Sequence, residues 1–128
     1  MRLDHVGVAT DDAAGLIELF TGLLNASVSH EETLDGMDIV FLDAGGCELE
    51  LLDPMSEETP VARFLERNGP GLHHLAFRVD DVAGSLETAA GMGLERLDES
   101  PRPGARGHRV AFLHPRSCGG ILVELVEP

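Results

Sequence analysis

The chain has 128 residues, 43% of them hydrophobic, which is typical of one globular domain with a buried core. No apolar run approaches the roughly 20 residues that span a bilayer. Strand-like sequence begins at once with no secretory signal, so a cytoplasmic protein is expected. The formal net charge of −14 makes nucleic acid and anionic membranes poor partners, and neither is predicted.

The basic residues are all arginine, nine in number, against 23 acidic residues. An ordered, acidic and lysine-free chain indicates adaptation to a high-salt, halophilic cytoplasm, where salt screens the self-repulsion. The two cysteines, Cys47 and Cys118, form no C-x-x-C motif. They are expected to be reduced structural thiols.

One short pattern occurs twice in the chain. A strand that opens with histidine and ends in a double aspartate lies at 4–12 and again at 71–81. Pairing His5 with His74 also aligns the two double aspartates and the residues that follow them. This repeat predicts two copies of one small unit.

The first half of the chain is predicted to hold one helix and four strands. In order, these are a strand at 3–9, a helix at 13–24 and strands at 26–34, 37–43 and 47–52. Asp12 supplies the helix N-cap, and Asp35-Gly36 is a strong hairpin signal. The first repeat unit is assigned to 1–54 and a connector helix to 55–70.

The second unit, 71–128, repeats this order. Its predicted elements are a strand at 72–79, a helix from Asp81 to Met92, a short strand at 94–97, a loop at 98–107 and strands at 109–113 and 121–126. The turn at 114–120 separates the last two strands. The expected fold class is α+β, with two βαβββ units in a single domain.

The repeat makes a geometric prediction about four polar residues. His5 and His74 open the first strand of each unit, and Glu50 and Glu124 lie in the last. If the units pack about a pseudo-twofold axis, equivalent residues converge on one concave sheet. Two imidazoles and two carboxylates suit a divalent transition metal with positions left for water or substrate.

These residues also have purely structural interpretations. A histidine near a strand start is often satisfied by ordinary hydrogen bonds, and Glu50 fits a solvated outer face opposite apolar neighbours. Glu124 interrupts the apolar run 121–126. A carboxylate buried there requires a partner, because burying a lone charge is costly, and a metal is one such partner.

The remaining histidines are assigned to structural or surface roles. His73 should point to the opposite face of its strand from His74. His30 and His108 lie in exposed polar stretches, and His114 at a strand end suits either turn packing or a substrate contact.

Three arginines surround the long loop. They are Arg102, Arg106 and Arg109. In so acidic a chain this local cluster indicates either anion binding or simple solvation.

Several motifs together resemble a known family. They are DHVGVA at 4–9, ELLDP at 50–54 with TPVA at 59–62, GLHH at 71–74, and FLHP at 112–115 running into GGILVEL at 119–125. This set resembles the vicinal oxygen chelate superfamily of glyoxalases, extradiol dioxygenases, antibiotic-resistance proteins and methylmalonyl-CoA epimerases. The resemblance is greatest to the epimerase family and covers essentially the whole chain.

The resemblance implies a fold and a ligand set. The fold would be two βαβββ units with mixed, mostly antiparallel curled sheets around a central metal site. The implied metal ligands are His5, Glu50, His74 and Glu124. They would hold a divalent metal ion, with Co²⁺ expected first and Mn²⁺, Ni²⁺ or Zn²⁺ as alternatives, and the resemblance also implies a homodimer.

The implied activity is epimerisation of an acyl-CoA thioester of propionate metabolism. The enzyme would interconvert (2R)- and (2S)-methylmalonyl-CoA by removing the α-proton through a metal-stabilised enolate. Two bases are needed on opposite faces of the α-carbon. Glu124 is assigned as one base, and the other is either Asp38 or Glu50.

Three alternatives remain. A glyoxalase acting on a glutathione hemithioacetal would share all four ligands. A ferrous dioxygenase would use two histidines and one carboxylate, to which Glu50 would be an addition. A metal-free small-molecule-binding protein of the same fold would not need the four polar residues.

Overall fold

The computed structural model describes residues 1–128 and forms two compact units. One unit is His5–His73, and the other is Met1–Asp4 together with His74–Pro128. The boundaries fall inside the first strand of each repeat rather than in a linker.

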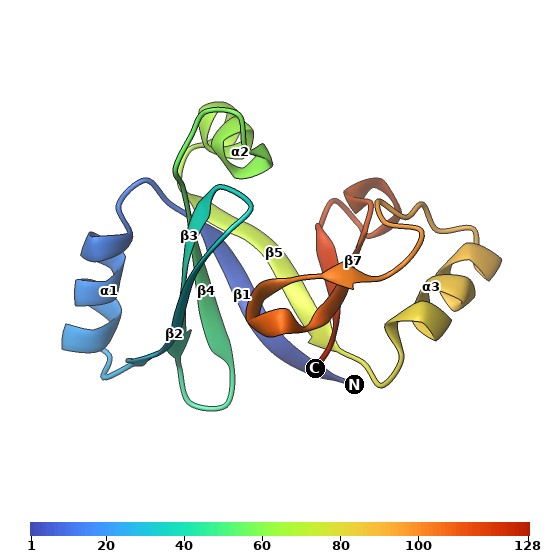
Figure 1. Cartoon of the computed structure of the whole chain (residues 1–128), viewed down its shortest axis with the longest axis horizontal. Helices are drawn as coiled ribbons and strands as arrows, with labels where there is room; N and C mark the ends of the chain where they lie inside the picture. The colour runs from blue at the N-terminus through green and yellow to red at the C-terminus, as the bar shows by residue number, and fades with distance from the viewer. The chain divides into compact units, whose positions relative to one another are not determined.

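The two repeat units of the sequence, called the first and second unit below, each have the element order strand, helix, strand, strand, strand (Figure 1). The first comprises β1 (Arg2–Ala9), α1 (Ala13–Gly22), β2 (Ser27–Leu34), β3 (Met37–Asp43) and β4 (Glu48–Pro54), followed by α2 (Pro60–Asn68). The second comprises β5 (Gly71–Arg78), α3 (Val82–Gly91), β6 (Arg102–Pro103), β7 (Arg109–Leu113) and β8 (Val123–Glu127), with short 3-10 turns at Ala105–Gly107 and Pro115–Ser117.

The two units share one strand topology. The order is β2-β3-β4-β1 in the first unit and β5-β8-β7-β6 in the second. The pairs β1–β4 and β5–β8 are parallel, and the other strand pairs within each unit are antiparallel. The predicted α+β class, with two mixed and mostly antiparallel βαβββ units, is confirmed.

Equivalent aspartates start the two long helices. Asp12 accepts a hydrogen bond from the backbone N–H of Gly15, and Asp81 accepts one from Gly84, each at 3.0 Å. Each bond satisfies one of the N–H groups that the first helical turn leaves unpaired. A Cβ on Gly84 would lie 2.5 Å from the Asp81 carboxylate, so glycine leaves room for the cap.

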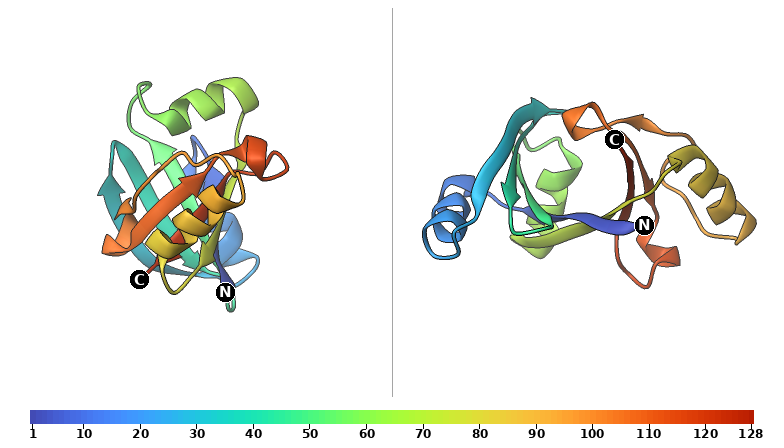
Figure 2. Two further views of the ribbon diagram at one scale, coloured as in Figure 1. Left: turned by 90° about the vertical axis from the view of Figure 1, so that its right-hand side faces the viewer. Right: turned by 90° about the horizontal axis from the view of Figure 1, so that it is seen from below.

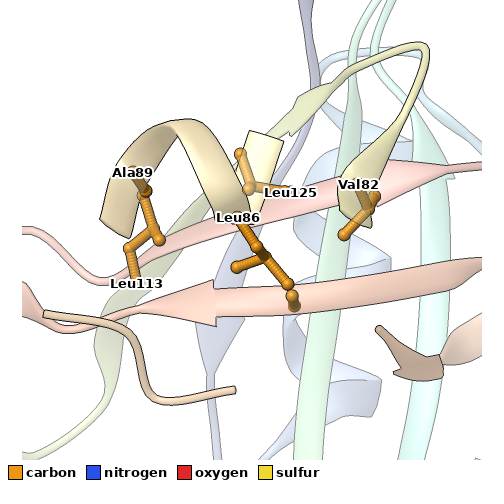
Figure 3. Close-up of a cluster of buried hydrophobic side chains, with 6 residues drawn as sticks. Val82, Leu86, Ala89, Leu113 and Leu125 are labelled. Atoms are coloured by element: carbon orange, nitrogen blue, oxygen red, sulfur yellow. The ribbon is translucent and has the colours of Figure 1, made fainter. Parts of the chain in front are cut away.

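The helices α1 and α3 each cover one face of the strands of their own unit (Figures 1 and 2). Side chains of α1 pack on Val40, Leu42 and Leu51. In the second unit, Val82, Leu86 and Ala89 of α3 pack on Ala111, Leu113 and Leu125 (Figure 3). Because strand side chains alternate, the residues between these positions lie on the face opposite the helix.

The structure corrects three predicted elements. Residues 94–97 form no strand and make only an isolated bridge between Arg96 and Leu113. The predicted loop at 98–107 contains the short strand β6, whose Pro103 suits the edge of the sheet. The last strand begins at Val123 rather than Ile121, because Gly119 and Gly120 form a turn with positive φ.

Two expectations about composition can also be checked. Cys47 and Cys118 are free thiols, as predicted. None of the helices combines the length and apolarity that crossing a bilayer requires.

Candidate active site

The first polar pair joins β1 to β4. In this parallel pair Gly7 is the register partner of Glu50, so His5 and Glu50 share a face one step apart. His5 Nε2 lies 3.3 Å from Glu50 Oε1, and the residues are only 4% and 5% exposed. Glu50 is therefore buried, and its interpretation as a solvated outer residue is wrong.

The second pair repeats the first between β5 and β8. Ala76 is the register partner of Glu124, which gives His74 and Glu124 the same diagonal relation. His74 Nε2 lies 3.7 Å from Glu124 Oε1, and the residues are 5% and 6% exposed. The repeat seen in the sequence thus produces the same buried imidazole–carboxylate pair in both units.

An aromatic ring supports each pair from the neighbouring antiparallel strand. Phe41 is the register partner of Glu50, and Phe112 is the register partner of Glu124. His5 meets Phe41 edge to face at 5.4 Å between ring centroids, and His74 meets Phe112 at 5.6 Å. We call the groups His5–Glu50–Phe41 and His74–Glu124–Phe112 the two site triads.

Sequence reasoning missed the two phenylalanines. A usable signal existed, since the chain has only five phenylalanines and no tyrosine or tryptophan. One of these five lies in the strand before each site glutamate. Their role depends on the β3–β4 and β7–β8 registers, which the sequence does not display.

The site triads place ionisable groups where burial is costly. Burying an unpaired carboxylate in a protein interior lowers the stability of the fold by roughly several kcal/mol. Removing one partner of a buried pair lowers it by about 3–5 kcal/mol. No buried side-chain nitrogen or oxygen atom lacks a hydrogen-bond partner. The buried polar groups are therefore satisfied within the fold.

The donor chemistry suits a metal ion. His5, His74 and Glu124 are buried residues of the types that ligate divalent transition metals. Imidazole nitrogen and carboxylate oxygen bind zinc, cobalt, manganese and nickel alike. Glu50 adds a fourth donor of the same kind next to His5.

Asp38 does not join the site triad of its own unit. Asp38 is the register partner of Asp53 on β4. Because it lies three residues before Phe41, its side chain points to the opposite face of β3. This is the face of Val40, which α1 covers further along the strand. Asp38 is exposed, and its carboxylate accepts a hydrogen bond from Thr33 Oγ1 at 3.1 Å.

The other histidines have local contacts. His73 packs against Phe64 of α2 with ring centroids 4.9 Å apart, in keeping with a structural role. His114 Nδ1 accepts a hydrogen bond from the backbone of Arg116 at 3.0 Å, which is turn packing. His30 is partly buried rather than a surface residue. Its Nε2 lies 2.9 Å from Glu32 Oε1, and its ring centroid lies 6.1 Å from that of Phe41.

The arginines around the long loop differ in their surroundings. Arg109 pairs with Glu127 at 3.5 Å and is largely exposed. Arg102 donates to Asp98 at 3.0 Å and lies over the ring of Phe112. Of these two arginines, Arg102 is the one that contacts a residue of a site triad, namely Phe112.

Comparison with known proteins gives one consistent result. Residues 4–112 match the profile of the "Glyoxalase/Bleomycin resistance protein/Dioxygenase superfamily". The chain is 36% identical to the mitochondrial methylmalonyl-CoA epimerase of Homo sapiens over 129 aligned positions, which cover 98% of this chain and 73% of the human one.

Solved structures agree with the sequence match. The crystal structure of methylmalonyl-CoA epimerase from Mycobacterium tuberculosis superposes with a TM-score of 0.94 at 35% identity, covering 99% of this chain and 87% of that one. A methylmalonyl-CoA epimerase in complex with methylmalonyl-CoA and NH4+ superposes with a TM-score of 0.92 at 35% identity, covering 98% and 93%.

Proposed function

Because the chain belongs to the methylmalonyl-CoA epimerase family of the glyoxalase superfamily, we propose that it interconverts (2R)- and (2S)-methylmalonyl-CoA. The observation that carries this proposal is the duplicated site triad. It brings a buried carboxylate beside a buried imidazole in each unit. Epimerisation needs two proton-transfer groups, one for each face of the α-carbon, and a duplicated fold offers two equivalent carboxylates.

We assign His5, Glu50, His74 and Glu124 as the ligands of one divalent metal ion. The donor types fit, and the burial of both carboxylates is easier to understand if a cation neutralises them. A bound divalent cation would act as a Lewis acid toward the negative charge that develops when the α-proton leaves. Cobalt is the first candidate, with manganese, nickel and zinc as alternatives.

The carboxylates of Glu124 and Glu50 are the proposed proton carriers. One carboxylate takes the α-proton, and the other glutamate, in its protonated form, delivers a proton to the opposite side of the planar carbon, which inverts the centre. Glu50 is the better second base than Asp38, because Glu50 shares a face and a contact with His5. The packing of Phe41 and Phe112 holds the two imidazoles in place.

Proton NMR in D₂O tests the reaction class directly. The enzyme is incubated with Co²⁺ and either the (2R) or the (2S) thioester, and the α-proton signal is followed. We expect loss of that signal together with conversion of the neighbouring methyl doublet to a singlet. A matched incubation without enzyme measures spontaneous exchange.

The outcome separates this activity from the other members of the superfamily. Exchange at the spontaneous rate with each metal would contradict the proposal. Turnover of the hemithioacetal of glutathione and methylglyoxal, without exchange of methylmalonyl-CoA, would instead indicate a glyoxalase.

Two further expectations complete the proposal. We infer that the protein acts as a homodimer in the cytoplasm, as the family resemblance implies. Light scattering after size exclusion measures the assembly, and a monomer mass at micromolar concentration would contradict the dimer.

A further inference from the structure

Arg102 extends the site triad of the second unit by one residue. Its guanidinium carbon lies 5.4 Å from the centroid of the Phe112 ring, and the same ring meets His74 at 5.6 Å. A single aromatic side chain therefore separates a permanent cation from a site imidazole. Arginine stays charged at any physiological pH, so this cation does not depend on conditions.

Arg102 also lies on the same face of the strands as Glu124. Its register partner on β7 is Val110, and Val110 alternates to the same face as Phe112, which pairs with Glu124. The α3 helix packs on the other face, through Ala111 and Leu113. Arg102 and Glu124 consequently share the face that α3 leaves uncovered.

Asp98 holds this arginine in position. Its Oδ1 accepts a hydrogen bond from Arg102 Nε at 3.0 Å, and its Oδ2 accepts one from the backbone N–H of Phe112 at 2.9 Å. The carboxylate thus ties the guanidinium to the strand that carries the aromatic ring. This bond uses Nε, and the N–H groups of the two terminal nitrogens are those that bind a carboxylate or phosphate in a fork.

The Arg102 side chain is half-exposed as well as anchored. The side chain of Arg102 is 45% exposed, while that of Asp98 is only 19% exposed. An arginine serving only as a partner of Asp98 would not need to lie over an aromatic ring. An arginine with an anchored Nε and a half-exposed side chain is suited to anion recognition.

The first unit has no arginine at the equivalent place. There, Glu32 lies opposite Ile39, as Arg102 lies opposite Val110, and the Glu32 carboxylate lies 2.9 Å from His30 Nε2. A histidine beside a carboxylate is a poorer anion site than a fixed guanidinium. The duplicated fold is thus chemically asymmetric, and the difference favours an anionic substrate group on the side of the second unit.

We propose that Arg102 is a specificity-determining residue that binds the free carboxylate of a 2-carboxyacyl thioester substrate. The proposal rests on the proposed function for the identity of that substrate. Arg102 would select acyl thioesters that carry a carboxylate on the α-carbon over the same thioesters without one. Asp98 is a positioning residue, since it acts by orienting Arg102.

Isothermal titration calorimetry tests this selectivity with a matched pair of ligands. Methylmalonyl-CoA and propionyl-CoA differ only in the carboxylate, and free coenzyme A reports on the rest of the molecule. In R102Q we expect methylmalonyl-CoA to bind about 10- to 100-fold more weakly, as for loss of a charge-assisted contact. Propionyl-CoA and coenzyme A should bind within about twofold of the wild type.

Two other variants and a folding control sharpen the result. R102K keeps the charge but loses the fork and should restore part of the affinity for methylmalonyl-CoA. R109Q removes an exposed arginine that pairs with Glu127 and should leave all three affinities unchanged. Circular dichroism and thermal melts establish that each variant is folded.

The inference and the proposed function fail in different ways. If R102Q weakens propionyl-CoA and coenzyme A as much as methylmalonyl-CoA, Arg102 binds a phosphate and the carboxylate assignment is wrong. If R102Q changes none of the three affinities, Arg102 has no role in recognition. Selective loss in R102Q without α-proton exchange by the wild type would overturn the epimerase function alone.

Discussion

The imidazole of His5 meets the ring of Phe41 edge to face, with 5.4 Å between the ring centroids and 86° between the planes. His74 and Phe112 repeat this contact at 5.6 Å and 82°. Edge-to-face packing restrains the orientation of the imidazole, and with it the direction of its nitrogen atoms. A metal site depends on such support nearly as much as on its ligands.

Phe112→Leu should therefore weaken metal binding. Residues that orient metal ligands typically contribute about 10- to 100-fold in affinity, and we expect a loss near the lower value for an aromatic contact. Calorimetric titration with Co²⁺ measures it. Phe20→Leu, which alters the packing of α1 on the other face of the strands, is the control. Equal loss of Co²⁺ affinity in both variants would show a general effect of stability instead.

Glu124→Gln should abolish α-proton exchange while leaving the fold intact. The amide has nearly the same shape but cannot accept the proton, and loss of a general base typically costs about 10²- to 10⁴-fold. NMR in D₂O measures the rate for both epimers. Glu87→Gln on the exposed face of α3 makes the same change of charge away from the site triads. A wild-type rate in Glu124→Gln would remove Glu124 from the mechanism.

Glu50→Gln and Asp38→Asn distinguish the two candidates for the second base. We expect Glu50→Gln to slow exchange from one epimer about 100-fold more than from the other, because each face has its own base. Asp38→Asn should keep both rates within about twofold of the wild type, since its side chain lies on the other face of β3. The opposite pattern would assign the second base to Asp38.

Metal removal should lower both activity and thermal stability. A ligand at 100 times its dissociation constant stabilises the folded state by about 2.7 kcal/mol, or about 10 °C in Tm for a chain of this size. The melt is recorded after treatment with EDTA and again after addition of Co²⁺, Mn²⁺, Ni²⁺ or Zn²⁺. His74→Ala should lose the metal-induced shift, whereas His73→Ala next to it should keep that shift. A shift that survives in His74→Ala would contradict the ligand assignment.

Salt should stabilise the folded chain. With a net charge of −14, self-repulsion is strong at low ionic strength and is screened as salt is added. We expect Tm to rise by several degrees, roughly, between 0.1 and 2 M KCl. Chloride is preferred to sulfate, because sulfate strengthens apolar burial in any protein. A constant or falling Tm would argue against adaptation to high salt.

Much of the architecture could be predicted because its causes are local. Asp12 and Asp81 cap their helices through bonds to residues three positions away, and Asp35-Gly36 turns its hairpin with both residues at positive φ. Such bonds depend on neighbours in the chain, so sequence reveals them. Two of the three corrected elements lie at 94–107, where short elements depend on pairing with the distant strand β7.

The candidate site, too, was only partly predictable from the sequence. By itself, the sequence determined the duplicated unit and the identity of the histidine and glutamate residues, because a repeat needs no knowledge of packing. Only the tertiary structure decided that Glu50 is buried, that Asp38 lies on the face away from it, and that Phe41, Phe112 and Arg102 belong beside the polar pairs. The physical reason is that alternation assigns side chains to two faces of a strand, whereas long-range pairing and helix packing determine which face is covered and which residues meet there.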